Sequence, residues 1–589
     1  MGFAPIPSLV HPVGNSLYNN PHSVTTDDFP RRQGSVSLQR EKLNKHNRSS
    51  KGPLSGQMDE ATLFFNFVRF LHQQHFAIGK FQLQVSTQPL EMASYLYQLL
   101  GMGPKRSAPA IVPTDEIAPL HLFDDTATLR GFTLVWTFKF DEVLDADLLG
   151  DSLSRLFQME GWRKLGGRLR RRPDGSAEIH IPCPFTEERP PLRFTKESFD
   201  MRISEHPEAS KLPSATDKLT IFPSARNYQS LALGPGAPKC IDDYFYSDHP
   251  IYGLHVVNFT DATLVSITFS HCISDLAGLM AVINAWQLVL AGKPEAVPPF
   301  KGFFEDTMAG LYKAEPTEKF VLADKQLTGF GLASFGLRFI FESWWNSPIE
   351  LKLVCIPKKM MDAFVRDARN QVSQSIEAST AGSSPAFISE NDIIVALATK
   401  TMARNLSPGR PITALQAVDP RSRVKSVFQQ DAAYVCNAPA AAFVQYTSQE
   451  AVDKTIGELA LESRKALLEQ LTEEQIKAFA ALAYKSMSVT GNPAMFGESN
   501  MALLLFSNWS KAAFLQTVDF SPAIVKSAET VRPDGKQGRP VYYHSQSIDT
   551  SPFSTNVIVI MGRDLEGNFW LNYPAHYWPA LLEQLERYA

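Results

Sequence analysis

The stretch Ser270 to Gly278 (SHCISDLAG) lies where a predicted strand meets a predicted helix. Before it, polar and apolar residues alternate in Thr263 to Ser270 (TLVSITFS), a pattern that predicts a half-buried strand. After it, apolar residues recur at helical spacing, and Asp275 occupies the position of a helix N-cap. The pattern therefore places His271 at a strand end, where a rigidly held neutral imidazole can act as a general base near neutral pH.

This motif is weak evidence when taken alone. Short His-x-x-x-Asp matches arise by chance, and a single histidine is more often a structural residue than a catalyst. Cys272 lies inside the motif, but no second histidine is adjacent to it to activate a thiolate, so we interpret it as a packing residue. The rest of the chain must decide between the two interpretations.

The composition indicates a large globular protein. The 589 residues are 44% hydrophobic and 11% aromatic, enough for two to four domains with a large core. A net charge of −4 gives no reason to expect a nucleic-acid partner. The five cysteines are scattered without C-x-x-C pairs, which argues against a disulfide framework or a metal site and for a reducing compartment. The basic cluster Arg163 to Arg172 favours a solvated strand and turn, with a cationic strip for an anionic substrate as the alternative.

No segment has the pattern of a secretory signal or of a membrane-spanning helix. The apolar stretch Gly329 to Trp345 is short for a span and contains Arg338 and Glu342, so it predicts an amphipathic helix on the protein body. Peripheral membrane contact through this helix is the alternative. We expect a soluble, cytoplasmic monomer without a transmembrane segment.

Composition and periodicity divide the chain into four parts. Residues 1–58 are polar and aperiodic and predict a disordered N-terminal extension, and residues 59–118 predict a helical preface and a Pro-rich linker. Residues 119–345 predict a first α/β domain that carries the motif and a connector, and residues 346–589 predict a second. Within the second, Ser373 to Pro385 predicts a flexible loop. Two mixed halves favour a pseudo-duplicated α/β protein with its site in the crevice between them.

Several separated stretches occur in one order along the chain. They are Leu120 to Asp125 (LHLFDD), Leu153 to Leu156 (LSRL), Lys164 to Leu169 (KLGGRL), His271 to Gly278, Val418 to Arg423 (VDPRSR), Asn437-Ala438, Ser507 to Trp509 (SNW) and Asp519-Phe520. This set resembles the BAHD-type acyl-CoA-dependent acyltransferases, in particular their fungal secondary-metabolism branch, over about residues 118 to 589. The resemblance implies two chloramphenicol-acetyltransferase-like domains with an active-site channel at their interface.

The resemblance also implies a role for each matching residue. His271 would take the proton from an acceptor hydroxyl or amine as that atom attacks the thioester of acyl-CoA, without a covalent enzyme intermediate. Asp275 would point away from the substrate, pair with Arg421 or Arg423, and fix the loop. Ser507 and Trp509 match the position that donates hydrogen bonds to the developing oxyanion.

One motif departs from the family pattern. The D-F-G-W-G segment of the family is here Asp519-Phe520-Ser521-Pro522-Ala523, without the glycines and the tryptophan. In the family this segment is structural and lies near the CoA side, so the departure concerns cofactor binding more than catalysis. Residues 1–118 have no counterpart in the family core.

The leading hypothesis is an O-acyltransferase that moves an acyl group, often acetyl, from acyl-CoA to a small hydroxylated secondary metabolite, with no metal. One alternative is a condensation-type enzyme that uses carrier proteins, but such sites usually have two adjacent histidines, and here Ser270 precedes His271. The other is an inactive scaffold relative, against which the intact His271 and Asp275 count. The acceptor, the acyl chain length, the choice of oxygen or nitrogen, and the role of residues 1–118 stay open.

Overall fold

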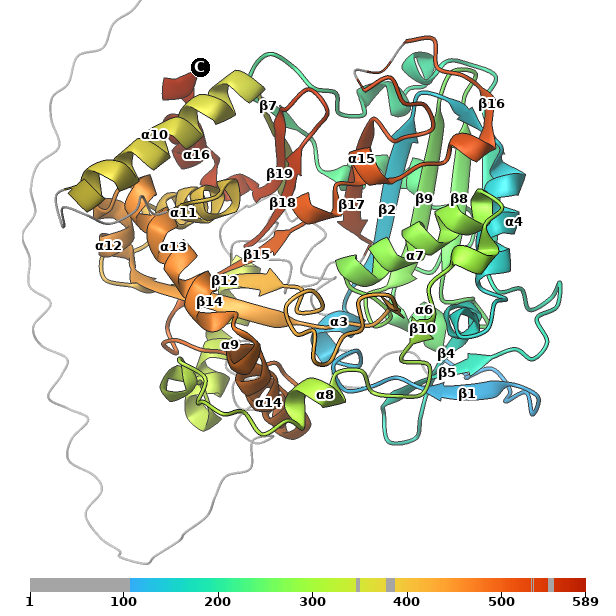
Figure 1. Cartoon of the computed structure of the whole chain (residues 1–589), viewed down its shortest axis with the longest axis horizontal. Helices are drawn as coiled ribbons and strands as arrows, with labels where there is room; N and C mark the ends of the chain where they lie inside the picture. Colours follow the sequence, from blue (N-terminus) through green and yellow to red (C-terminus); the bar gives the residue numbers. More distant parts are fainter. Residues whose placement is uncertain (1–105, 346–349, 378–386, 531, 533, 549–555) are drawn as a thin grey trace, which may run out of the picture. The chain divides into compact units, whose positions relative to one another are not determined.

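The computed structural model describes residues 106–345, 350–377, 387–530, 532, 534–548 and 556–589 (Figure 1). They all belong to the second of the chain's two compact units, Ser86–Ala589. The predicted extension over residues 1–58, and most of the predicted preface and linker over residues 59–118, lie outside this part of the chain.

A five-stranded sheet presents the histidine motif. Its strands, in spatial order, are β17 (Tyr542–Ser547), β2 (Thr133–Phe140), β9 (Thr263–Ser270), β8 (Gly253–Asn258) and β6 (Arg193–Ser198). The helices α4 (Ala146–Leu156) and α7 (Leu276–Leu290) pack on one face of this sheet, where their leucines join aromatic and aliphatic side chains of β2 and β9 in a single core (Figure 1). Burial of this apolar area is the main stabilising contribution to the sheet.

The half-buried interpretation of Thr263 to Ser270 was wrong, because all eight residues of β9 are buried. The strand is paired on both sides, by β2 and by β8. Its second face is covered by a crossover segment with the short helices η4 (Ala225–Tyr228) and α5 (Gln229–Ala232), which contact β17, β9 and β2. Polar side chains on that face are therefore inside the protein, and Ser266 shares a 2.9 Å hydrogen bond with Thr137.

The second large sheet has seven strands. Its order is β14 (Ala440–Thr447), β12 (Pro411–Val418), β15 (Ala502–Asn508), β18 (Val557–Arg563), β19 (Phe569–Pro574), β11 (Leu351–Ile356) and β7 (Thr220–Phe222). Side chains of α10 (Lys358–Glu377), α11 (Glu390–Ala403), α13 (Ile456–Gln470) and α16 (Trp578–Leu585) join one face of this sheet in a second core.

The two sheets exchange strands. β17 comes late in the chain yet pairs with β2 along its whole length, from Tyr542↔Lys139 to Ser547↔Leu134. In the opposite direction, β7 comes early in the chain and pairs with β11 of the second sheet. Each sheet therefore depends on a segment from the other predicted half, and the limits of 119–345 and 346–589 stay a prediction.

The remaining elements are small sheets and peripheral helices. The strands are β1 (Glu116–Pro119), β5 (Ala177–Ile181) and β4 (Arg168–Arg171) in one sheet, β10 (Phe300–Lys301) with β13 (Ala433–Tyr434), and β16 (Ile524–Lys526) with β3 (Val143–Leu144). The helices are α3 (Ala127–Arg130), α6 (Ile241–Phe245), α8 (Ala309–Tyr312), α9 (Gly329–Trp345), α12 (Ser448–Asp453), α14 (Glu473–Thr490) and α15 (Phe514–Thr517).

The helix predictions have mixed outcomes. Asp145 is the N-cap of α4 and accepts a 3.0 Å bond from the amide of Leu148, a residue whose side chain is exposed. The prediction of a flexible loop from Ser373 was wrong for the first five residues, because α10 continues to Glu377. Val372, on the same helix, is buried. The rest of that loop lies outside the described residues. α9 is a helix as predicted, and no described helix is long and apolar enough to cross a membrane.

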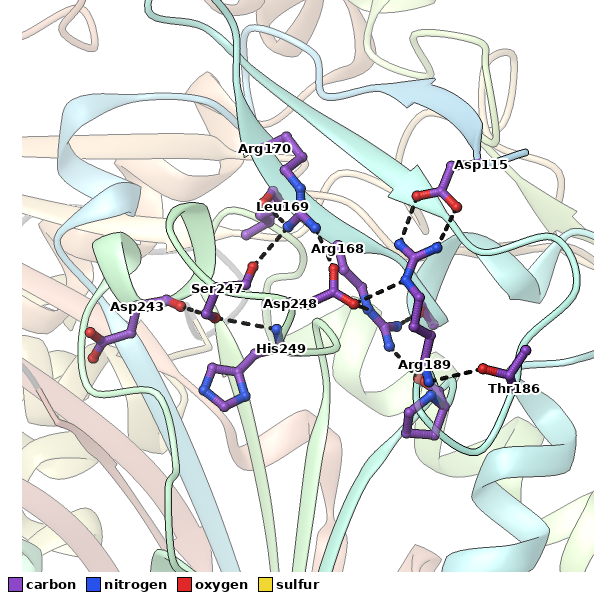
Figure 2. A network of polar contacts seen from close by, with 12 residues as sticks. Asp115, Arg168, Leu169, Arg170, Thr186, Arg189, Asp243, Ser247, Asp248 and His249 are labelled. Carbon is purple, nitrogen blue, oxygen red and sulfur yellow. Dashed lines mark hydrogen bonds and ion pairs between the residues drawn. The ribbon is translucent and has the colours of Figure 1, made fainter. Parts of the chain in front are cut away.

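The basic cluster Arg163 to Arg172 is not simply the solvated strand that we predicted. Arg168 is fully buried, and the guanidinium of Arg170 lies beside Asp248 (Figure 2). Asp248 also accepts a 3.0 Å bond from Arg189, which in turn binds both carboxylate oxygens of Asp115. These internal partners allow Arg168 and Arg170 of β4 to lie inside the protein, whereas Arg171 is exposed. The two buried charges are therefore paired within the fold and are not presented to a substrate.

Candidate active site

The end of β9 and the start of α7 hold His271 in a fixed loop. Its backbone amide donates a 2.8 Å bond to the carbonyl of Phe132, the residue just before β2, and its carbonyl accepts a 2.8 Å bond from the side-chain amide of Asn437. The side chain is half-buried, and its Nδ1 has no hydrogen-bond partner among the described residues. Burial lowers the pKa of the imidazole, an effect larger than the opposing influence of Asp275. The ring is therefore neutral at neutral pH, as a general base requires.

Asp275 is fully engaged by structural partners. Its Oδ1 accepts a 2.9 Å bond from the amide of Gly278, which makes it the N-cap of α7 as predicted, and its Oδ2 accepts a 3.0 Å bond from the amide of Ala438. Both carboxylate oxygens also accept bonds of 3.1 Å from Arg421. The carboxylate thus ties the motif loop to the segment that contains Ala438.

The structure distinguishes the two candidate arginines. Arg421 pairs with Asp275, and its Nη2 also donates a 2.9 Å bond to the carbonyl of Cys436. Burial lowers the pKa of Arg421, but the carboxylate of Asp275 offsets this effect, and the pKa is raised overall. Arg423 is exposed, and its pKa is lowered, first by partial desolvation and then by repulsion from Arg464. Arg421 is therefore the partner that the sequence left undecided.

Asp124 and Asn437 form a second set of contacts that holds the His271 loop, and the sequence analysis did not predict this role. Asp124 Oδ1 accepts bonds from the backbone amide of Asn437 at 2.6 Å and from its side-chain amide at 2.9 Å. The same side-chain amide reaches the carbonyl of His271, so Asn437 bridges Asp124 and the loop. Burial raises the pKa of Asp124 to about 7. The signal was the pair of motifs LHLFDD and Asn437-Ala438, which the sequence pattern marked without assigning a role.

Ser507 and Trp509 lie at the end of β15. The indole Nε1 of Trp509 donates a 2.8 Å bond to Ser507 Oγ, and its ring packs 4.4 Å from that of Trp136. Because an indole has a single N–H, the hydrogen of Trp509 is already used, whereas the hydroxyl hydrogen of Ser507 remains available. The geometry thus gives the two residues different roles: Ser507 is a potential hydrogen-bond donor, and Trp509 fixes the position of its hydroxyl.

Asp519 and Phe520 pack against α7. Phe520 is buried, with its ring 4.5 Å from Trp286 on α7 and 5.5 Å from Phe140. The amide of Asp519 binds the side chain of Gln287 on the same helix. The degraded motif therefore still packs against the helix that begins at Asp275.

No group of His, Cys, Asp and Glu side chains suited to a metal ion occurs within the part of the chain that the structure describes. Burial raises the pKa of Cys272 to about 12, so the thiol stays protonated at neutral pH.

Known proteins resemble this chain in sequence and in fold. No protein-family model matches it. It is 34% identical to the O-acetyltransferase PaAT-2 of Phomopsis amygdali, over 81% of this chain and 99% of that protein. It is 33% identical to the acetyltransferase pyiB of Pyricularia grisea, over 81% of this chain and 94% of that protein. The structure of F. sporotrichioides TRI101 with coenzyme A and T-2 matches with a TM-score of 0.53 at 14% identity, over 80% of this chain and 97% of that one.

The chain belongs to the BAHD-type acyltransferases. The BAHD fold, with its two chloramphenicol-acetyltransferase-like domains, is thereby confirmed, and PaAT-2 and pyiB are both named acetyltransferases. A further BAHD-like relative, from Penicillium decumbens, is 32% identical over 79% of this chain and 94% of its own length and carries the name transcriptional regulator calD.

Proposed function

We propose that this protein transfers an acyl group, often acetyl, from acyl-CoA to a hydroxyl of a small secondary metabolite, with His271 as the general base. The observation that supports it best is that the two polar residues of the motif have different environments. His271 has a half-buried ring whose pKa burial lowers, while Asp275 has its carboxylate committed to Gly278, Ala438 and Arg421.

The base would work as follows. The acceptor hydroxyl is a poor nucleophile until its proton is removed, and a positioned general base contributes about 10²–10⁴-fold to such a step. Neutral His271 would accept this proton as the acceptor oxygen attacks, becoming an imidazolium, and would later give the proton to the departing thiolate sulfur. Nδ1 is buried, so Nε2 is the nitrogen that we assign to the acceptor.

Acyl-CoA supplies an activated acyl group that needs no covalent enzyme intermediate. The donor set fits a thioester, because Ser507 has a free hydroxyl hydrogen that Trp509 orients through its indole N–H. We assign Ser507 as the donor to the developing negative charge, and Trp509 as the residue that positions it. Asp519 and Phe520 would act on the CoA side only through the packing of α7.

Asp275 and Arg421 would hold the loop and take no part in proton transfer. The ion pair is largely buried, and breaking it would displace the segment from His271 to Asp275. The proposal further includes a monomer in a reducing cytoplasm. Light scattering of the purified protein tests the monomeric state. A count of reactive thiols in the denatured protein tests the reduced state, in which all five cysteines are free.

The test measures the release of CoA by thiol titration, for the wild type and for the His271→Ala variant. Each would receive acetyl-CoA and longer acyl-CoAs with hydroxylated terpenoid, polyketide and alkaloid acceptors and their amine analogues. His576→Ala, at an exposed histidine, is the matched control. Acceptor-dependent release that persists in the control and disappears in His271→Ala supports the proposal.

Two other results would contradict it. Full turnover by a folded His271→Ala protein would remove the base assignment. A folded wild type that neither binds acyl-CoA nor releases CoA would instead favour a carrier-protein-dependent enzyme or an inactive scaffold relative.

A further inference from the structure

A continuous chain of side-chain hydrogen bonds begins at the end of β15, on the face of the sheet that α11 and α13 cover. Asn508 Nδ2 donates a 2.7 Å bond to Asn391 Oδ1, and Asn391 Nδ2 donates a 2.9 Å bond to Gln416 Oε1. Gln416 Nε2 in turn donates a 3.0 Å bond to Ser463 Oγ. We call these four residues the amide chain. It connects four elements in the order β15, α11, β12 and α13.

The amide chain lies in surroundings where such bonds are strong. Gln416 and Ser463 are buried, and Asn391 and Asn508 are partly buried. Away from water, hydrogen bonds strengthen, and bonds that run in one direction polarise one another. A polar chain whose members are all paired therefore specifies a single arrangement of the elements that it joins.

The first turn of α11 gives the amide chain a fixed base. The turn is held by a capping box between Ser389 and Asp392. Glu390, which precedes Asn391, accepts bonds of 2.9 and 2.6 Å from Arg563 at the end of β18. Because β12, β15 and β18 are adjacent parallel strands, this one turn is bonded to side chains near the ends of all three.

Asn508 connects this base to the donor that we assigned to the developing negative charge. Its Oδ1 accepts bonds of 2.9 Å from the amide of Ser510 and of 2.6 Å from the Ser510 hydroxyl, which closes a turn around Trp509. Successive residues of a strand point to opposite faces, so Ser507 lies on the face opposite the amide chain. The end of β15 is thus held from one face and carries the donor on the other.

The position of this donor matters for the reaction. An oxyanion donor acts at about 2.7–3.1 Å from the oxygen that becomes negative, and a misplacement of about 1 Å can cost about 10²-fold in rate. We propose that Asn391 and Asn508 are positioning residues, which hold residues 507–509 so that the Ser507 hydroxyl meets the developing negative charge. This inference rests on the proposed function.

Two substitutions of Asn391 test the bonds separately from the size of the side chain. Asn391→Leu is similar in size but can neither donate nor accept, so Asn508 loses its partner. Asn391→Asp keeps the acceptor for Asn508, the Gln416 amide can turn over to donate to the second carboxylate oxygen, and an acidic residue is favourable in the first turn of a helix.

The two variants should differ in kcat. In Asn391→Leu, kcat should fall about 10- to 10²-fold while KM for acetyl-CoA is unchanged, because the oxyanion exists only in the transition state. Asn391→Asp should keep at least about half of the wild-type kcat. The matched control is Gln371→Leu, which removes a partly buried amide that accepts a 2.9 Å bond from the amide of Gly457 and so joins α10 to α13. This control should leave kcat unchanged.

A double variant tests whether Asn391 acts through Ser507. In Ser507→Ala the donor is already absent, so adding Asn391→Leu should lower kcat by less than about twofold more. Losses that multiply would show that Asn391 affects turnover by another route and would overturn the inference.

Hydrogen exchange of the free protein gives a readout that does not depend on turnover. The amides of residues 507–512 should exchange faster in Asn391→Leu than in the wild type, and at the wild-type rate in Asn391→Asp and Gln371→Leu. This result supports the anchor even where the wild type transfers no acyl group. Unchanged exchange in Asn391→Leu would overturn the inference, as would an unchanged kcat when Ser507→Ala is impaired. Full turnover by both His271→Ala and Ser507→Ala would instead contradict the proposed function, and with it the catalytic purpose of the anchor.

Discussion

The substitution Asp275→Asn tests the claim that the motif aspartate is a structural anchor. In the wild type, Asp275 accepts four hydrogen bonds from three donor groups, namely the amides of Gly278 and Ala438 and the two terminal nitrogens of Arg421. Asparagine keeps the shape but has one acceptor oxygen. In either amide orientation its NH₂ group faces one backbone N–H and one guanidinium N–H, and the charge of Arg421 loses its principal counter-ion.

The size of the effect follows from burial. The side chains of Arg421 and Asp275 are only 12% and 23% exposed, and removing one partner of a buried pair typically costs about 3–5 kcal/mol. With about 2–4 °C per kcal/mol for domains of about 150–250 residues, Tm should fall by roughly 10 °C. The double variant Asp275→Asn/Arg421→Met removes both charges and should recover part of this loss.

Thermal unfolding followed by circular dichroism measures these values, with CoA release at a temperature where every variant is folded as the second readout. The matched control is Asp147→Asn, whose ion pair with Lys196 is exposed on both sides and should contribute no more than about 1 kcal/mol. If Asp275→Asn costs no more than this control, the anchor role is refuted. If it keeps its Tm but loses all turnover, Asp275 takes part in the chemistry directly.

Three further outcomes follow from the site. Because burial lowers the pKa of His271, the base stays neutral on the acid side of its ordinary range, and kcat/KM should begin to fall only below about pH 6.5, as a pH profile would show. Ser507→Ala should lower kcat by about 10²–10³-fold. Trp509→Phe should lower kcat less, because it removes only the N–H that orients Ser507. Equal losses in the two variants would contradict these roles. Phe520→Ala should cost about 3–5 kcal/mol in a denaturant titration, whereas Arg423→Ala should change neither stability nor turnover.

The elements that periodicity could reveal were largely predicted. The alternation in β9 and the helical spacing after it are local properties of the chain, and so is the cap of Asp275 on α7. The burial of both faces of β9 was missed because a covering segment, residues 225–232, comes from a distant part of the sequence. The same reason explains Arg168, whose inward orientation depends on partners that no local pattern indicates.

The candidate site could be predicted in its residues but not in its connections. The order of motifs pointed to Asp275 and to a pair of arginines, and only the paths of their side chains distinguish Arg421 from Arg423. The bridge from Asp124 through Asn437 to the histidine loop joins residues more than three hundred positions apart. The pairing of β17 with β2 is equally non-local, because it depends on the exchange of strands between the two sheets.

That exchange has a consequence for how the chain is made. During synthesis, β2 emerges roughly 400 residues before β17, and at about 5–20 residues per second its edge waits on the order of 20–80 s for its partner. The waiting strand, TLVWTFKF, is rich in β-branched and aromatic residues, the composition of a segment that pairs readily with other chains. A nascent or truncated chain that stops before Tyr542 therefore exposes this edge, and soluble yield should depend on chaperone capacity until the last fifty residues are complete.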